Sequence, residues 1–151
     1  MIYIKNTQRT YSIDVHQVKD DLNRMLDFLG YPDFAISIWF TTEKTIQHYN
    51  MHFRHMNKPT DVLSFPYHAD LEPGQRIVAD TQDDKNLGDI LIAPAYVDKQ
   101  LADWNQTFPQ RLRILLVHSV CHLLGYDHIT DAEYDQMQKQ EDILIAMLEN
   151  K

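Results

Sequence analysis

The sequence contains almost no cysteine and no long apolar run. Cys121 is the only cysteine, which excludes a framework of internal disulfides and is consistent with a reducing compartment. No apolar stretch approaches the ~20 residues that a membrane-spanning helix needs. The N-terminal segment MIYIKNTQRT also lacks the apolar core of a signal peptide. These absences predict a cytoplasmic protein with no membrane segment.

Basic residues are also scarce. The chain has 14 Lys and Arg against 22 Asp and Glu, which gives a formal net charge of -8. Affinity for nucleic acid comes largely from Lys and Arg side chains that release counterions from the phosphates. The composition therefore excludes a broad surface that tracks a phosphate backbone, and any contact with RNA has to use a local basic patch.

The remaining composition is that of an ordinary folded chain. Of the 151 residues, 44% are hydrophobic and 24% are charged, and the sequence has no internal repeat or low-complexity tract. This length suffices for one domain with a core and is too short for two ordinary domains. We therefore expect one domain over residues 1–151.

The spacing of apolar residues predicts alternating helices and strands. Helices are expected at residues 14–30, 43–55, 94–104, 109–125 and 130–149, where caps, prolines and glycines mark their ends. Strands are expected at residues 34–40, 61–66 and 87–94. The polar, acidic stretch 68–86 is expected to be a long surface loop. This pattern predicts an α+β domain.

Three histidines stand close together in residues 118–128, HSVCHLLGYDH. Residues four apart share one face of a helix, so His118 and His122 can direct both imidazoles at one ion. Gly125 can take the left-handed conformation that ends a helix, and the returning chain can bring His128 as a third ligand. A three-histidine site leaves a tetrahedral zinc one position for water, which is typical of catalytic sites. The spacing predicts one zinc per chain, bound at the end of a helix, and no organic cofactor.

A second set of histidines, His48, His52 and His55, also has helical spacing. No glycine or turn closes this set, and the nearby Arg54 and Lys58 would repel a cation. We expect these three histidines to lie on a solvated helix face.

The motif also matches the zinc metalloprotease pattern H-E-x-x-H-x-x-G-x-x-H, with one difference. Ser119 stands where a protease carries the glutamate that acts as general base. A peptidase would need another base, such as Asp127. Cys121 is expected to be a small buried hydrophobic residue and not a ligand. Because this base is missing, a zinc-dependent peptidase or amidase is a weaker interpretation than another kind of zinc enzyme.

Three sequence blocks together resemble the YbeY family of bacterial rRNA maturation factors, which are metal-dependent endoribonucleases. The blocks are NMHFRHMNKPTDVLSFP at residues 50–66, LGDI at residues 87–90 and the histidine motif. They follow the family's order, and TDVLSFP combined with the histidine motif is highly specific. The resemblance implies an α+β fold in which a small mixed sheet lies beside helices. Ser119 and Cys121 depart from the family's usual glycine and leucine, but both are small or apolar.

The resemblance also implies roles for individual residues. It places zinc in a cleft, bound by His118, His122 and His128, and makes Arg54 the functional arginine. A guanidinium can donate two parallel hydrogen bonds to the phosphoryl oxygens that gain charge during attack. Asp127 is a candidate for orienting a histidine or relaying a proton. The remaining candidates are RNA contacts at Lys58, Arg111 and Arg113, and structural or supporting carboxylates at Asp61 and Asp89.

The activity implied by the resemblance is cleavage of single-stranded RNA during rRNA maturation. The expected process is maturation of the 3′ end of small-subunit rRNA together with ribosome quality control. The expected partners are rRNA and the ribosome or ribosomal proteins. Two alternatives remain: a zinc-dependent peptidase or amidase, and a non-catalytic ribosome-assembly factor that contains zinc.

Overall fold

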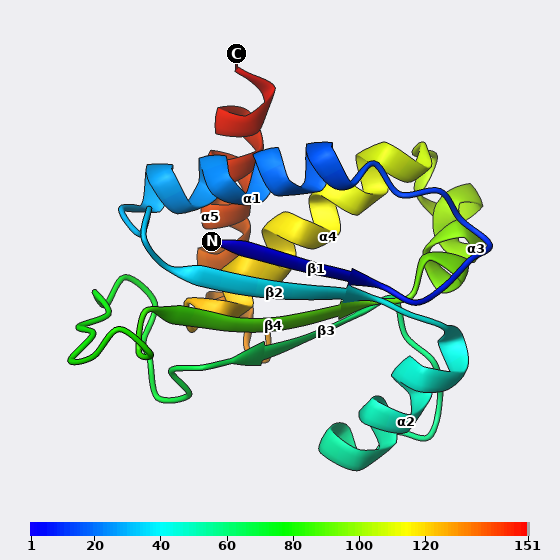
Figure 1. Cartoon of the computed structure of the whole chain (residues 1–151), viewed down its shortest axis with the longest axis horizontal. Helices are drawn as coiled ribbons and strands as arrows, with labels where there is room; N and C mark the ends of the chain where they lie inside the picture. The colour runs from blue at the N-terminus through cyan, green and yellow to red at the C-terminus, as the bar shows by residue number, and fades with distance from the viewer. Residues whose placement is uncertain (151) are drawn as a thin grey trace.

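A four-stranded mixed sheet organises the computed structural model, which describes residues 1–150 (Figure 1). Its strands are β1 (Ile2–Asn6), β2 (Ala35–Phe40), β3 (Val62–Pro66) and β4 (Asn86–Ile92), in the spatial order β1-β2-β4-β3. β1, β2 and β4 are parallel to one another, whereas β3 is antiparallel to β4 and forms an edge of the sheet. The prediction of an α+β fold with a small mixed sheet is confirmed.

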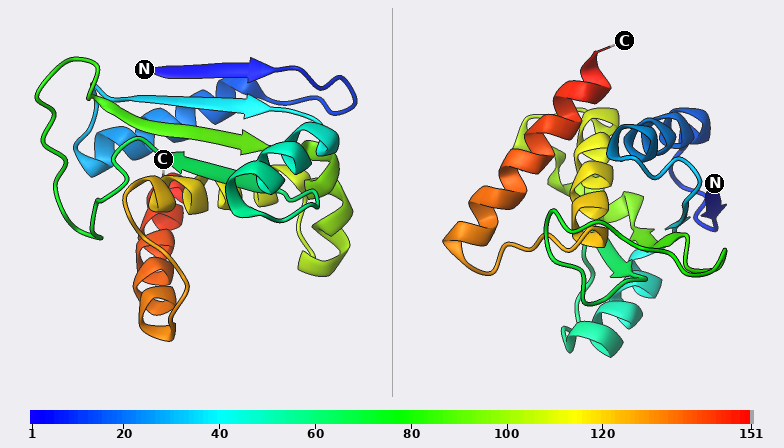
Figure 2. Two further views of the ribbon diagram at one scale, coloured as in Figure 1. Left: turned by 90° about the horizontal axis from the view of Figure 1, so that it is seen from below. Right: turned by 90° about the vertical axis from the view of Figure 1, so that its left-hand side faces the viewer.

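Five helices accompany the sheet, as the sequence predicts. They are α1 (Val15–Leu29), α2 (Glu43–Arg54), α3 (Pro94–Trp104), α4 (Phe108–Leu123) and α5 (Asp131–Glu149). Two views show α1 and α4 over one face of the sheet, α5 beyond them, and α2 on the opposite side (Figures 1 and 2). Among residues 1–150, no helix combines the length and the apolar character needed to cross a membrane.

The main core lies between the sheet and the layer of α1, α4 and α5. Alternate residues of β2 point into this core, and Ile36, Ile38 and Phe40 are at most 2% exposed. The same period of two sends Ser37 and Trp39 to the other face of the sheet. The main helical layer thus covers only one face of the sheet, and the other face packs against α2 and against Tyr96 of α3.

β1 is a strand that the sequence prediction missed. Its five residues pair in parallel with β2, and Ile2 and Ile4 face the main core. A strand of this length at the edge of a sheet has only two or three residues that face the core. Such a pattern is too short to distinguish from a loop by periodicity.

Residues 68–85 contain no helix or strand, as predicted, and β4 begins at Asn86, the last residue of the predicted loop. The loop is nevertheless anchored to the domain. The Arg76 guanidinium donates hydrogen bonds to the carbonyl oxygens of Leu29 and Gly30 and lies 4.0 Å from the centre of the Tyr31 ring. The backbone N–H of the buried Ile77 donates to the Tyr31 hydroxyl over 3.0 Å. These contacts hold the loop against the end of α1, and so the segment is only partly a surface loop.

Candidate metal centre

α4 presents two histidines of the motif on one face. The helix begins with a reciprocal capping box, in which Thr107 and Gln110 each accept the other's backbone N–H in their side chains. The side of α4 that faces the sheet is fully buried, whereas His118 and His122 lie one turn apart on a half-buried face. The cap and the apolar face therefore fix the rotation of α4, which aims both imidazoles away from the core.

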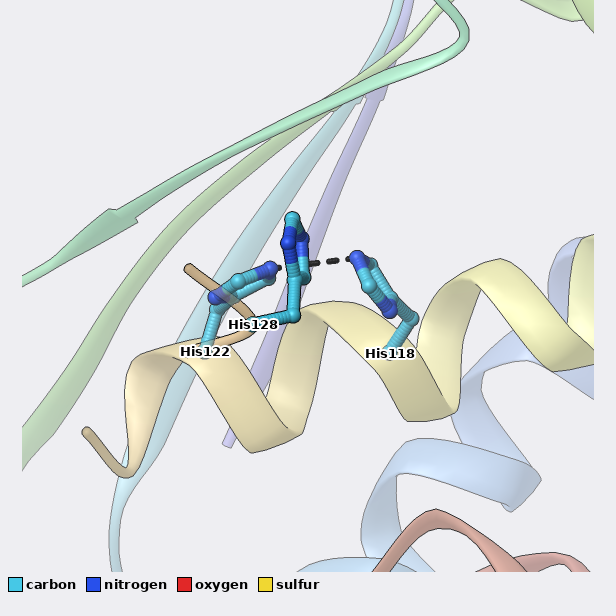
Figure 3. Close-up of side chains that lie close together, drawn as sticks. All are labelled: His118, His122 and His128. Atoms are coloured by element: carbon cyan, nitrogen blue, oxygen red, sulfur yellow. Dashed lines mark hydrogen bonds between the residues drawn. The ribbon is translucent and has the colours of Figure 1, made fainter. Parts of the chain in front are cut away.

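The turn after α4 brings the third histidine alongside the first two. Gly125 has a φ of 95°, and a Cβ atom at this position would lie 2.2 Å from the carbonyl oxygen of Leu71. Only glycine fits both the left-handed backbone and this close approach. The chain then reverses, and the His128 ring centre lies 5.5 Å from that of His118 and 5.1 Å from that of His122 (Figure 3).

The three histidines have the geometry of a metal site. One ring nitrogen from each lies within 4.8 Å of the others, and the Nε2 atoms of His118 and His122 are 3.1 Å apart. A tetrahedral zinc with bonds of about 2.0–2.1 Å separates two ligand nitrogens by roughly 3.3 Å. The observed spacing is close to this value. Within residues 1–150, this is the one group of three such side chains placed to share an ion.

Two of the histidines are oriented through their other ring nitrogen. Nδ1 of His122 lies 2.9 Å from the Tyr126 carbonyl oxygen, and Nδ1 of His118 lies 3.3 Å from a carboxylate oxygen of Glu141. With the proton held on Nδ1 by these acceptors, the Nε2 lone pairs face each other and are free to bind an ion. This arrangement is the one that histidine ligands of metals usually have.

The electrostatic environment keeps His122 uncharged. Burial, together with the nearby charges of His118 and His128, lowers the pKa of His122 to about 4. A metal binds the neutral imidazole, so a histidine with a low pKa needs no deprotonation at neutral pH. The donor set, its spacing and the low pKa of His122 all fit a divalent cation such as zinc.

A cleft of about 810 Å³ opens beside the three histidines, and we call it the metal cleft. Its walls come from β3, the end of α2, the loop after β3 and the turn after α4. Arg54, the last residue of α2, lines this cleft, is exposed and makes no hydrogen bond or ion pair within residues 1–150. Its guanidinium is therefore free to meet an anion that enters the cleft.

Asp127 also lines the metal cleft and supports the third histidine. One of its carboxylate oxygens accepts the backbone N–H of His128 over 2.8 Å. This bond fixes the backbone immediately before the His128 side chain. The structure thus brings Arg54 and Asp127 to the same cleft as the three histidines, as the sequence prediction requires.

Lys58 and Arg111 are not among the residues that line the metal cleft. Lys58 is exposed. The Arg111 guanidinium lies 3.7 Å from the Asp61 carboxylate and 4.3 Å from the centre of the Trp104 ring. Asp61 also accepts the Val62 backbone N–H, a contact of the structural kind expected for this carboxylate, and it lines the metal cleft as well. Arg111 is thus held in a local cluster.

Arg113 is also absent from the lining of the metal cleft and forms an ion pair within the fold. Its guanidinium donates two hydrogen bonds of 3.0 Å to the carboxylate of Asp21, which is 2% exposed. This bidentate pair joins α4 to α1. The structure does not bring Arg113 together with the other predicted site residues.

The two residues where the motif departs from the family are both buried. Ser119 and Cys121 are each 0% exposed, and the Ser119 hydroxyl has no hydrogen-bond partner within residues 1–150. Ser119 therefore faces the interior, where it cannot act as a base toward a molecule in the cleft. Burial raises the pKa of the Cys121 thiol well above its usual range. The prediction that Cys121 is a small buried residue is confirmed.

The second set of histidines packs against aromatic rings. The His48 ring meets Tyr49 edge-on with centres 5.6 Å apart, and the His52 ring meets Phe53 in the same way at 4.7 Å. His55 ends α2 with a left-handed backbone, at a φ of 59°. These side chains lie on the exposed surface of α2, as expected for a solvated face.

Sequence reasoning missed two polar residues of the site. Glu141 lies on α5, one helix beyond the motif, and no local spacing connects it with His118. His68 lines the metal cleft from the loop after β3, where its Nε2 lies 2.9 Å from the Asp84 carbonyl oxygen. The only signal for Glu141 was an acidic residue beside an apolar stretch of an amphipathic helix, and this pattern is common.

Comparison with known proteins agrees with this geometry. The family described as "Endoribonuclease YbeY" matches residues 3–149 of the chain. A human protein named "Endoribonuclease YbeY" is 38% identical over 144 residues, covering 95% of this chain and 86% of its own. A Shouchella clausii protein of the same name is 38% identical over 130 residues, covering 84% of this chain and 81% of its own.

One solved structure supports the fold. The solution structure of TM1509 from Thermotoga maritima superposes with a TM-score of 0.62 and 23% sequence identity, covering 98% of this chain and 89% of that one. At this level of identity the likeness concerns the fold alone. The family assignment stands on the match over residues 3–149 and on the two relatives above. This chain belongs to the Endoribonuclease YbeY family.

Proposed function

We propose that this chain is a metal-dependent endoribonuclease that cleaves single-stranded regions of rRNA. The process we propose is maturation of the 3′ end of small-subunit rRNA and ribosome quality control, in the cytoplasm. The observation that carries this proposal is the convergence of three histidine nitrogens within 4.8 Å of one another, in a cleft that Arg54 also lines. The names of the relatives support the reaction class.

We propose zinc as the metal, at one ion per chain. All three donors are imidazoles, which suit zinc, and the spacing of the first two nitrogens is near that of a tetrahedral site. Such an ion would supply Lewis-acid polarisation and a water of lowered pKa. His118, His122 and His128 would hold it, while Glu141 and the Tyr126 carbonyl fix the orientation of two of these rings.

Arg54 and Asp127 are the residues that act on the phosphodiester in this proposal. As the phosphorus is attacked, charge develops on its equatorial oxygens, and the free Arg54 guanidinium can donate two hydrogen bonds to them. One carboxylate oxygen of Asp127 accepts the His128 backbone N–H, and the other oxygen, which has no hydrogen-bond partner within residues 1–150, can accept a proton. The peptidase alternative lacks this support because Ser119, at the position of the protease base, is buried.

The charge distribution supports a ribosomal partner. Arg111 and Arg113 both lie against carboxylates of this chain, and among residues 1–150 Arg54 is the one Lys or Arg that lines the metal cleft. A chain with a net charge of -8 and so few free cations gains little affinity from phosphates alone. We propose that the ribosome or its proteins hold the enzyme near the rRNA.

The test is single-turnover cleavage of purified rRNA at saturating enzyme, with the metal content of each variant measured. His118→Ala should lose cleavage together with metal. Arg54→Lys should keep the metal but cleave roughly 10- to 1000-fold more slowly, because a lysine ammonium cannot donate the two parallel hydrogen bonds of a planar guanidinium. Arg9→Lys is the matched control, since Arg9 is exposed and outside the cleft. Full cleavage by both site variants would refute the proposal.

A further inference from the structure

The face of the sheet opposite the main core forms a second hollow, of about 610 Å³, between the strands and α2. We call it the open-face hollow. Strand register places its side chains in two rows across the sheet. The first row consists of Tyr3, Ser37, Asp89 and Phe65. The second row consists of Lys5, Trp39, Leu91 and Leu63.

Aromatic rings from the sheet and from α2 surround this hollow. The Trp39 and Tyr49 rings meet edge-on with centres 5.9 Å apart, and the Tyr49 and Phe53 rings are parallel at 6.1 Å. The Phe53 and Phe65 rings meet at 5.0 Å. Tyr3 and Phe53 are each 54% exposed, so large aromatic surfaces face solvent here. An exposed cluster of this size indicates a binding surface.

Polar groups occupy the middle of the first row. Ser37 and Asp89 are direct neighbours on adjacent strands, and neither side chain makes a hydrogen bond within residues 1–150. An apolar protein segment laid over this row would bury the Asp89 carboxylate without a hydrogen-bond partner, which is unfavourable. A flat ring with hydrogen-bond donors on its edge can instead stack on the aromatic groups and bond to the carboxylate. The row therefore favours a nucleobase over an apolar peptide.

The Asp89 carboxylate selects among bases. An ionised carboxylate only accepts hydrogen bonds, and adenine, guanine and cytosine carry exocyclic amino groups that donate. Uracil has no amino group, and the one donor on its pairing edge, N3–H, lies between two carbonyl oxygens that an anionic carboxylate repels. Lys5, whose ammonium lies 4.4 Å from the centre of the Trp39 ring, can reach an adjacent phosphate.

The open-face hollow adjoins the metal cleft. Phe53 and Phe65 line both spaces, so the two spaces meet at the edge strand β3 and the end of α2. A single strand whose backbone lies in the metal cleft can therefore pass over this edge and place a neighbouring base on the open face. Stacking of unpaired bases on exposed aromatic side chains of a four-stranded sheet is an established mode of RNA recognition.

We propose that the open-face hollow binds an unpaired base that carries an amino group, from the same RNA strand that enters the metal cleft. This inference rests on the proposed function, because it takes that strand as the substrate. Tyr3, Trp39 and Phe65 provide the stacking surface. Asp89 accepts a hydrogen bond from the amino group, which disfavours uracil.

Trp39 provides a direct reporter of this binding. The chain has two tryptophans, at positions 39 and 104, so the Trp104→Phe protein carries Trp39 as its only tryptophan. Ten-nucleotide oligocytidylate and oligouridylate are mixed with this metal-loaded protein, and fluorescence is recorded before cleavage. Oligocytidylate should quench Trp39 and bind at least about 5-fold more tightly than oligouridylate, a difference on the scale of one hydrogen bond to a charged group.

Two further variants separate the contribution of base stacking from that of the hydrogen bond between Asp89 and the amino group of the base. Tyr3→Leu should weaken oligocytidylate binding by about 5- to 100-fold, the range found for loss of one base–aromatic stack. Asp89→Asn should remove the preference for cytosine over uracil, because an amide both donates and accepts. Phe28→Leu is the matched control, since Phe28 is 53% exposed on α1 and lines neither space.

Failure of this inference can be told apart from failure of the proposed function. If the wild type cleaves RNA while Tyr3→Leu and Asp89→Asn bind both oligomers as the control does, the open-face hollow binds no base. If no oligomer changes Trp39 fluorescence, the inference is also overturned, and a protein segment becomes the occupant to test. Quenching of Trp39 without any RNA cleavage would support base binding and reject the nuclease.

Discussion

Glu141 and His118 meet across two helices, with a carboxylate oxygen of Glu141 3.3 Å from Nδ1 of His118, although 23 positions separate the two residues in the chain. Both side chains are half-buried, so water screens this contact only in part. A carboxylate acceptor keeps the proton on Nδ1 and makes Nε2 a stronger donor to a metal. α5 therefore contributes to the metal centre without supplying a ligand.

Glu141→Ala should weaken metal binding by about 10- to 100-fold, the usual effect of removing a group that supports a histidine ligand. The fold should persist, because Glu141 is one half-buried residue of a long helix. Competition for zinc against a chelator of known affinity measures the effect. Asp142→Asn is the matched control, since its neighbouring carboxylate is exposed. Equal affinities for both variants would show that Glu141 does not support the site.

His122→Ala should abolish stoichiometric zinc binding, because His122 is the middle ligand of the sequence motif and its ring lies close to both other histidine rings. Elemental analysis of the purified variant measures the loss. The triple variant His48→Ala, His52→Ala, His55→Ala should keep one zinc per chain. Metal loss in the triple variant, with retention in His122→Ala, would mean that the wrong histidines have been assigned.

Arg113→Met should destabilise the protein by about 3–5 kcal/mol, because it leaves the carboxylate of Asp21 buried without its partner. Urea denaturation measures the change in the free energy of unfolding. Adding Asp21→Asn to Arg113→Met should recover part of the loss, since the second change removes the unpaired charge. If Arg113→Met alone is as stable as the wild type, the ion pair does not stabilise the fold, and Arg113 could have another role, such as RNA contact.

Cys121 should be inert toward thiol reagents in the folded protein. Its side chain is 0% exposed, and burial raises the pKa of the thiol, so both access and thiolate fraction are low. An aromatic disulfide reagent at pH 8 should react slowly without denaturant and promptly in 6 M urea. Fast reaction in the native protein would place Cys121 in an open environment that the structure does not show.

Local spacing accounts for the part of the site that the sequence predicts. His118 and His122 are one helical turn apart, and the positive φ at position 125 requires a glycine. The short segment 118–128 is therefore sufficient to predict the cluster. The helices α1, α4 and α5 were also predictable, because each has several buried apolar residues at helical spacing and a side-chain cap at its N-terminus. The bounds of these elements differ from the predicted ones by one or two residues, where helix ends fray.

Long-range contacts account for what the sequence could not predict. The ion pair between Asp21 and Arg113 joins residues 92 positions apart, and only the packing of α1 on α4 brings them together. The sequence does not reveal this ion pair, and so it predicted Arg113 as an RNA contact. The row of Tyr3, Ser37, Asp89 and Phe65 likewise depends on strand order, which the sequence does not specify.

Metal reconstitution tests the central claim most directly. Metal-free protein is prepared with a chelator, verified by elemental analysis, and supplied with zinc in steps below and above one equivalent per chain. Single-turnover cleavage of a single-stranded rRNA fragment should rise in proportion to zinc and level off at one equivalent, because the three histidines form one site. Full cleavage by the verified metal-free protein would contradict a metal-dependent nuclease at this cleft.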